Sequence, residues 1–460
     1  MSDTGRRTFL RSLAAAGGLT ALAPSLGGLI AYAVDPRAGG SRHGATRRTP
    51  GYGPLRPAGP ELELPEGFRY AKFGVQGDRM SDGLPTPLAH DGMAAFAGPD
   101  DDVLLVRNHE VRSRPLETAL DEEFAYDRLA GGGTTTLRVR IASDGMPRLV
   151  ADHESLAGTL VNCAGGPTPW GTWLTCEETT LGLSSGYERA HGYVFEVPAG
   201  ADARVRRPQP IRAMGRFIHE AVAIDPATGI AYLTEDAQTA GFYRFLPAAP
   251  GRFLEGGRLQ MLGLRDAPHR MTISHQRVGR PLPVVWIDIE DPDPADAERY
   301  PLTVFAEGYG NGGALFSRLE GCWYGDGAIH FNATSGGNAQ CGQIWQYRPG
   351  ADDDVGELTL LYESPSADVL KSPDNITVSP RGGIVLCEDT SGSYVRGLGR
   401  DGVIFDFARN ILNGREFAGA CFSPDGRVLF FNIQGDTAPG GAGHLGMTFG
   451  VWGPWERGPL

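Results

Sequence analysis

Lysine is the rarest charged residue in this 460-residue chain, occurring only as Lys72 and Lys371. Arginine therefore carries almost all of the positive charge. Acidic residues outnumber basic ones by 55 to 42, which gives a formal net charge of −13. An acidic surface disfavours nucleic acids and anionic membranes, so the sequence predicts neither as a partner. Inside a site, however, carboxylates are the ligands that multivalent cations require.

The cysteines form no Cys-x-x-Cys pair, which excludes a zinc-finger pattern and a disulfide scaffold. A single disulfide could still form, but the spacing selects no pair. The chain also lacks His-Glu-x-x-His, Gly-x-Ser-x-Gly and Walker motifs, so these signatures of zinc proteases, serine hydrolases and nucleotide binding are excluded. The six cysteines are Cys163, Cys176, Cys322, Cys341, Cys387 and Cys421.

Long helix-forming stretches are also scarce, because glycine and proline occur 66 and 34 times. Both residues interrupt helices and favour turns. From about residue 64, short alternating apolar runs are separated by turn residues, as at 103–106, 135–141 and 193–197. No amphipathic helices lie between these runs, which argues against a parallel α/β fold. The pattern predicts an all-β protein.

A weak repeat in the second half predicts the architecture. Its unit is a strand, a turn with proline or glycine, a second strand and then, in two of the four copies, acidic residues. The copies are residues 221–236, 375–389, 420–432 and, in degenerate form, 321–332. Pro380 and Pro424, in two of the turns, lie 44 residues apart, the length of one four-stranded propeller blade. We therefore expect a β-propeller of about five or six blades with loop insertions over residues 64–460, with a pair of β-sandwiches as the alternative.

The N-terminus predicts export. Arg6 and Arg7 precede a weakly apolar stretch rich in Ala, Gly and Leu, which ends in small residues. This order is typical of a bacterial twin-arginine signal peptide, residues 1–33, and is too weakly hydrophobic for a stable membrane anchor. We expect the twin-arginine machinery to deliver the folded protein to the periplasm or the medium. Residues 34–63, rich in Pro, Gly and Arg, are expected to form a linker or extended arm.

Acidic residues recur where the expected strands begin or end. In a propeller such strand ends surround one mouth of the central channel, so acids from separate blades could together hold several hard cations. A carboxylate that only faces water is the simpler interpretation of each one alone, and the recurrence argues against it for the set. The set comprises Glu110, Glu177, Glu178, Glu220, Glu235, Asp236, Glu320, Glu388, Asp389 and Glu416.

Residues 170–179 add a thiol to this set, because Cys176 directly precedes Glu177 and Glu178. Thiolates bind transition metals, whereas carboxylates suit calcium, magnesium or ferric iron. A site with both kinds of ligand would hold two kinds of ion. The alternative is a buried structural cysteine beside two solvated glutamates.

Seven blocks resemble, in order, those of the PhoX-type alkaline phosphatases. The resemblance spans roughly residues 64–435, and its specificity lies in the order of the blocks together with the export signal. The blocks are Asn-His-Glu at 108–110, Cys-Glu-Glu at 176–178, Gly-Arg-Phe-Ile-His-Glu at 215–220, Arg-x-Glu at 318–320, Pro-Asp-Asn at 373–375, Glu-Phe-Ala-Gly-Ala-Cys-Phe-Ser-Pro-Asp-Gly at 416–426 and Phe-Asn-Ile-Gln at 431–434.

The resemblance implies an exported propeller that hydrolyses phosphate monoesters, or diesters, with two ferric ions and calcium. It assigns Cys176 as the thiolate ligand of a di-iron pair, with Glu220 and Glu320 joining the iron and calcium positions. Arg318 would hold the phosphate oxygens, for which its planar fork is suited. The family also uses a lysine at the phosphate, and Lys371 lies near a matching block. The implied calcium ligands are Glu110, Glu177, Asp236 and Glu416.

Two other functions fit the same residues. One is a calcium-dependent propeller hydrolase of lactones or sugar esters, and the other is a non-catalytic propeller that binds a ligand. Cys176 separates the phosphatase from both, because a calcium-only site has no use for a thiolate. Under the leading hypothesis the chain acts as a monomer on small phosphate esters.

Overall fold

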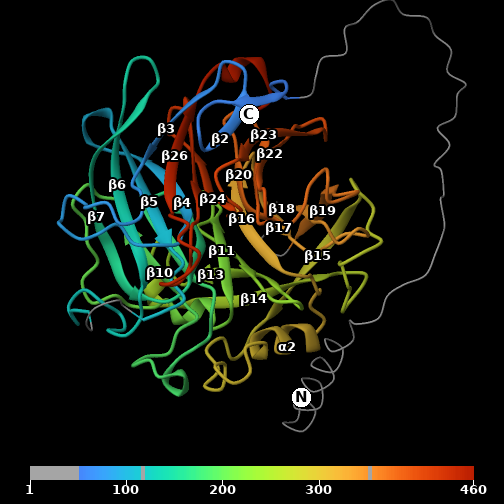
Figure 1. Cartoon of the computed structure of the whole chain (residues 1–460). Helices are drawn as coiled ribbons and strands as arrows, with labels where there is room; N and C mark the ends of the chain where they lie inside the picture. The colour runs from blue at the N-terminus through green and yellow to red at the C-terminus, as the bar shows by residue number, and fades with distance from the viewer. Residues whose placement is uncertain (1–50, 115–119, 351–354) are drawn as a thin grey trace, which may run out of the picture. The chain divides into compact units, whose positions relative to one another are not determined.

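The computed structural model describes residues 51–114, 120–350 and 355–460. This part of the chain is almost entirely β-structure, and the one α-helix within it, α2, spans Thr303–Gly310 (Figure 1). No helix in the described ranges is long and apolar enough to cross a membrane. The expected signal peptide, residues 1–33, lies outside the described residues, as do residues 34–50.

The first three groups of antiparallel strands lie between His90 and Leu264. Within each group, consecutive strands pair with one another. Group one is β4 (His90–Ala97), β5 (Val103–His109), β6 (Gly132–Ile141) and β7 (Pro147–Thr159). Group two is β8 (Asn162–Pro167), β9 (Thr172–Glu177) and β10 (Val194–Pro198). Group three is β11 (His219–Ile224), β12 (Ala231–Glu235), β13 (Phe242–Pro247) and β14 (Gly257–Leu264).

Three further groups follow, and β15 (Pro281–Asp288) joins group three to group four in one nine-stranded sheet. Group four is β16 (Leu319–Gly325), β17 (Ala328–Ala333), β18 (Gln343–Pro349) and β19 (Gly356–Glu363). Group five is β20 (Pro373–Val378), β21 (Ile384–Glu388), β22 (Tyr394–Leu398) and β23 (Ile404–Asn410). Group six is β24 (Phe417–Phe422), β25 (Val428–Ile433) and β26 (Met447–Trp452).

The first strands of the six groups form a closed ring. In the order β4, β8, β11, β16, β20 and β24, each contacts the next, and β24 contacts β4 again. Each group thus extends outward from a central axis as one blade, with its first strand innermost. This arrangement confirms the predicted all-β propeller, and the ring gives six blades.

The outer edges of the fifth and sixth blades are completed by strands from the beginning of the described chain. Strand β3 (Arg69–Phe73) pairs with β26 and completes the sixth blade, so that blue β3 lies beside red β26 in Figure 1. Strands β2 (Leu62–Pro65) and β1 (Leu55–Pro57) extend the fifth blade through pairing of β2 with β23. The compact unit that contains the propeller spans Gly51–Leu460.

A shift of register recurs near the start of the inner strands. In β4, for example, His90 pairs with His109, but the next paired residue is Met93. The bulge brings the strand backbones together at the axis, where small residues are required. A Cβ on Gly92 would lie 2.5 Å from the Cα of Ala164 in the next strand. The equivalent residues are Gly92, Ala164, Ala221, Gly321, Asn375 and Gly419.

Candidate metal centre

In five of the six inner strands, the residue directly before the closely packed bulge residue could supply a metal ligand. In these five strands it is the first unpaired residue of the bulge, whereas in β24 the register shift comes one residue later and Ala418 still pairs with Asn432. Five blades place a carboxylate or a thiol there, and the sixth places Ala418. We call these five residues the inner ring: Asp91, Cys163, Glu220, Glu320 and Asp374.

A second set of residues comes directly after the second strand of each blade. In each blade the backbone N–H of this residue donates to the carbonyl of the residue that precedes the inner strand, for example from Glu110 to Ala89 at 2.8 Å and from Asp389 to Ser372 at 3.0 Å. This bond anchors the residue at the mouth of the channel. We call the acidic members the outer ring: Glu110, Glu178, Asp236 and Asp389; blades four and six have Thr334 and Gln434 there instead.

The two rings and Glu416, which precedes β24, bring ligand atoms from different blades together. Four groups of three residues have one ligand atom each within 4.8 Å of one another. One group contains a thiol, a ligand that transition metals prefer. The other three contain only carboxylates, the ligands that calcium prefers. The groups are Glu110–Cys163–Glu178, Asp91–Glu110–Glu416, Glu220–Glu320–Asp374 and Asp374–Asp389–Glu416.

The electrostatics of the inner ring fit bound cations. Both carboxylate oxygens of Glu220, and Oδ1 of Asp91, are buried without a hydrogen-bond partner among the described residues. Burial raises the pKa of Glu220 well above its usual range, and the charges of Asp374 and Glu178 raise it further. Leaving such groups buried and unpaired is costly, and multivalent cations would satisfy them. The residues present therefore fit a metal centre.

Arg318 lies beside this centre in a backbone conformation that side chains rarely adopt, with φ of 48°. Its Nε and Nη2 each donate to Asp236 at 2.9 Å, and Nη2 also donates to Oε1 of Glu320 at 2.5 Å. Its side chain remains 31% exposed. The guanidinium thus joins an outer-ring acid of blade three to an inner-ring acid of blade four while it still faces solvent.

A polar pocket opens at the same mouth of the channel. Its volume is about 230 Å³, and its lining includes members of three of the four ligand groups. Beneath the inner ring, by contrast, the small residues leave an axial void of about 10 Å³. Access to the centre is therefore from the polar mouth. The pocket is lined by Glu110, Arg112, Asp389, Gly414, Arg415, Glu416, Gln434 and Thr437.

The family model of the alkaline phosphatase PhoX matches residues 50–437. The chain belongs to the PhoX family. This confirms the resemblance predicted from the blocks, and the protein is a phosphatase enzyme.

One solved structure supports the fold. Pseudomonas fluorescens PhoX in complex with vanadate, a transition-state analogue, aligns with a TM-score of 0.66 and 17% identity over 89% of this chain and 99% of that one. A gluconolactonase from Xanthomonas campestris aligns with a TM-score of 0.41 and 12% identity over 89% and 100%. No curated protein matches the sequence.

The structure places Cys176, the predicted thiolate ligand of this PhoX-family site, away from the candidate ligand groups. Cys176 lies in β9, the second strand of its blade, and packs in an apolar cluster with residues such as Phe217 and Val222. It belongs to none of the ligand groups found among the described residues. Cys163, in the inner strand β8, is the thiol that belongs to a ligand group. Aligning the strand starts His90-Asp91, Asn162-Cys163 and His219-Glu220 would have indicated this residue.

The carboxylate of Glu177, predicted as a calcium ligand, accepts hydrogen bonds from the chain at both oxygens. Oε1 accepts hydrogen bonds from the backbone N–H of Leu160 at 3.0 Å and from His191 Nδ1 at 2.6 Å. Oε2 accepts from the backbone N–H groups of Gly192 and Tyr193 at 2.8 and 3.2 Å. The neighbouring Glu178 belongs to the thiol-containing group instead.

The other predicted metal residues lie at the mouth as expected. Glu110, Glu220, Glu320 and Glu416 belong to the ligand groups, whereas Asp236 is paired with Arg318. From the sequence, Asp91, Cys163 and Asp374 were not predicted as ligands, and Glu178 and Asp389 were placed among the strand-end acids without being assigned as ligands. Asp91 and Asp374 follow the first paired residue of their strands, so the bulge position is the signal that finds them.

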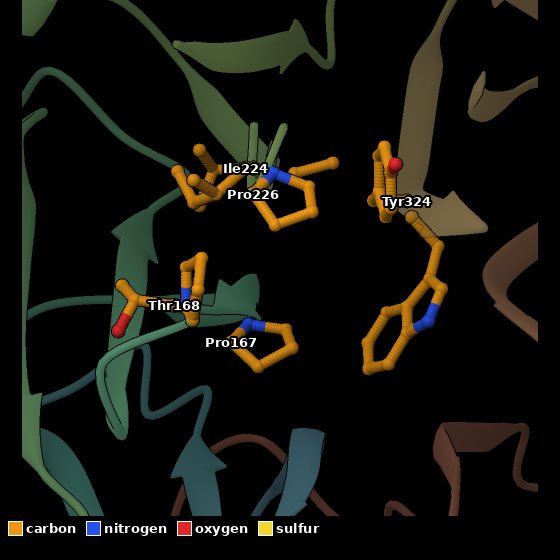
Figure 2. Close-up of a pocket in the computed structure, with 9 residues that line it drawn as sticks. Pro167, Thr168, Ile224, Pro226 and Tyr324 are labelled. Carbon is orange, nitrogen blue, oxygen red and sulfur yellow. The ribbon is translucent and has the colours of Figure 1, made fainter. Parts of the chain in front are cut away.

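The opposite ends of the inner strands form a different surface. An apolar pocket of about 200 Å³ lies there between blades two, three and four. Figure 2 shows Pro167 and Pro226 facing Tyr324 across it. Trp323 lines both this pocket and the axial void, so its indole separates the far mouth from the space below the inner ring. The polar chemistry of this phosphatase is thus confined to one mouth.

Proposed function

We propose that this PhoX-family phosphatase hydrolyses phosphate monoesters at a centre that holds iron and calcium. The observation that supports it most strongly is the inner ring, in which one thiol and four carboxylates from five blades converge. A thiol favours a transition metal, and the carboxylate groups favour calcium. The Glu110–Cys163–Glu178 group would therefore hold iron, and the all-carboxylate groups around Asp374 and Glu416 would hold calcium.

The bound cations would supply Lewis-acid stabilisation of the phosphoryl charge and a nucleophile of lowered pKa. The residues of the chain have three tasks around them. Arg318 binds phosphate oxygens with its planar guanidinium and stabilises the charge that develops on them. The small residues beneath the inner ring exclude water from the axial side. Glu220 and Asp91, held by the strand bulges, keep their ligand oxygens preorganised.

We also propose that the phosphatase acts outside the cytoplasm as a monomer on small phosphate esters. The paired arginines Arg6 and Arg7 and the mildly apolar stretch after them support twin-arginine export. The test is localisation of the Arg6→Lys/Arg7→Lys double variant in a bacterial host. Retention of this variant in the cytoplasm is expected, and its normal export would overturn the proposed route.

Metal analysis of protein exported by its own signal tests the site. About two iron ions per chain together with calcium are expected, along with hydrolysis of p-nitrophenyl phosphate that a chelator abolishes. Restoration by iron and calcium, but not by zinc and magnesium, is the matching control. Calcium without iron, combined with hydrolysis of a lactone but not of the phosphate ester, would overturn the proposal.

A further inference from the structure

Arg112 lies at the polar mouth, two residues beyond the outer-ring Glu110. Its Nη2 contacts Oε1 of Glu110 and lies 2.8 Å from Oε2 of Glu178. Both carboxylates belong to the thiol-containing group. The side chain is nevertheless 49% exposed and lines the pocket of about 230 Å³. Arg112 therefore contacts the proposed iron ligands and the substrate space at the same time.

Arg112 and Arg318 are arranged alike on the two sides of the outer ring. Arg112 joins Glu110 of blade one to Glu178 of blade two, and Arg318 joins Asp236 of blade three to Glu320 of blade four. Glu178 and Asp236 are close enough for their charges to interact. The two guanidinium groups thus flank the Glu178–Asp236 pair at the mouth.

The charge of Arg112 becomes available when the centre is loaded. Without cations, the guanidinium is neutralised by two carboxylates. Once Glu110 and Glu178 share their charge with bound cations, Arg112 retains N–H donors that face the pocket, and a phosphate oxygen is the acceptor for which such a planar fork is suited. Lys371 has no such position: it does not line the mouth pocket, and its backbone N–H binds Glu388.

We propose that Arg112 is a second phosphate-binding residue, across from Arg318, and that it favours monoesters over diesters. The inference rests on the proposed phosphatase function. A monoester has three non-bridging oxygens, whereas a diester has two. With the metal centre and Arg318 contacting two oxygens, Arg112 contacts the third, which only a monoester offers.

The test compares wild type with Arg112→Gln in the metal-loaded protein. Loss of a charge-assisted hydrogen bond should raise the Kd of inorganic phosphate, measured by calorimetry, about 10-fold to 100-fold. The KM for p-nitrophenyl phosphate should rise by a similar factor, while kcat and the KM for bis-p-nitrophenyl phosphate change little. Arg128→Gln is the matched control, because Arg128 pairs with Glu188 on the surface and should change none of these values.

Metal content decides between phosphate binding and a purely structural role. Arg112→Gln with unchanged iron and calcium but weaker phosphate binding supports the proposal. Only partial recovery of phosphate affinity in Arg112→Lys supports a requirement for the planar guanidinium. Unchanged phosphate affinity, or weaker binding that only accompanies metal loss, would overturn it. A wild type that hydrolyses no phosphate ester would instead overturn the proposed function, so the two failures are distinguishable.

Discussion

Cys163 and Cys176 show how strand position decides the chemistry of a residue. Both thiols are buried in neighbouring strands of blade two. Cys163 lies in the bulge of β8, 3.9 Å from Oδ2 of Asp91, and burial together with Asp91 and Glu220 raises its pKa well above the ordinary value. A nearby cation would reverse this effect and stabilise the thiolate. Cys176 faces apolar side chains and has no such use.

The two cysteines form a matched pair of variants. Cys163→Ala should lose iron, and its activity should fall at least about 100-fold. Loss of a residue that only orients a metal ligand already lowers activity by up to about 100-fold, and loss of the ligand itself should lower it no less. Cys176→Ala should retain iron and cost about 1 kcal/mol of stability, as an ordinary small core substitution does. Iron content, p-nitrophenyl phosphate hydrolysis and thermal unfolding measure these effects. Iron loss in Cys176→Ala but not in Cys163→Ala would contradict the assignment.

His191 gives the fold a pH dependence of its own. Burial opposes its protonation, but the carboxylates of Glu177 and Asp127 outweigh burial and raise the pKa of His191 to about 9. Because this exceeds the unfolded value of about 6.5, the ion pairs stabilise the fold fully below pH 6.5 and lose their effect as pH rises to 9. The free energy of unfolding should therefore fall by up to about 3 kcal/mol across this window.

Urea unfolding of wild type and His191→Gln at pH 6 and pH 9.5 isolates this effect. The variant removes the cation but keeps a donor toward Glu177. The stability difference between the two proteins should be largest at pH 6 and small at pH 9.5. A difference that does not change with pH would show that His191 is not charged in the fold.

At the scale of the element, the inner strand is the unit that builds the site. Five of the six combine a bulge with a side chain of the inner ring, and the residue after that side chain lies close to the neighbouring strand. At Gly92 the nearest atoms are the backbone of Cys163 and Ala164, which belong to the strand carrying the proposed iron ligand. Because backbone cannot move aside as a flexible side chain can, spacing between β4 and β8 is sensitive to added volume.

Gly92→Ala should therefore displace β4 from β8. We expect a loss of about 1–3 kcal/mol in the free energy of unfolding, together with weaker iron retention during dialysis against a chelator. Gly414→Ala is the stability control, because a Cβ there would meet only the Cβ of Ser391, at 3.9 Å. Equal stability of the two variants would contradict the close approach of these strands.

At the scale of the whole molecule, completion of the last two blades depends on strands from opposite ends of the described chain. Strands β2 and β3 pair with β23 and β26, and Leu62, Leu64, Phe68 and Phe73 are buried with them. Without these strands, the two C-terminal blades would have exposed edges and an uncovered apolar surface.

Truncation tests this dependence. A chain beginning at Gly51 should unfold at the same temperature as the signal-free protein. A chain beginning at Val75 should aggregate or melt at a much lower temperature, because each lost buried side chain contributes about 1.5–3 kcal/mol. Thermal melts and size-exclusion chromatography distinguish the two. A stable, monomeric chain from Val75 would contradict the role of β2 and β3.

The sequence by itself determined the propeller and the set of strand-end acidic residues at one mouth of its channel. Strand alternation, turn residues and the repeat at 375–389 and 420–432 are local patterns, so they are readable without knowledge of the packing. The ordered blocks likewise indicated the PhoX family. Strand-end acids such as Glu220 and Glu320 could be placed because a propeller orients equivalent strand ends toward the same axis.

Only the tertiary structure decided which side chains meet. The bulge in each inner strand changes which residue faces the axis, and this selected Cys163 over Cys176 and added Asp91 and Asp374. Glu177 and Glu178 are adjacent in sequence, yet long-range donors saturate only the first. Residue type and spacing do not distinguish Cys163 from Cys176, or Glu177 from Glu178. Strand register and hydrogen bonds between separate segments distinguish them, and both depend on the tertiary structure.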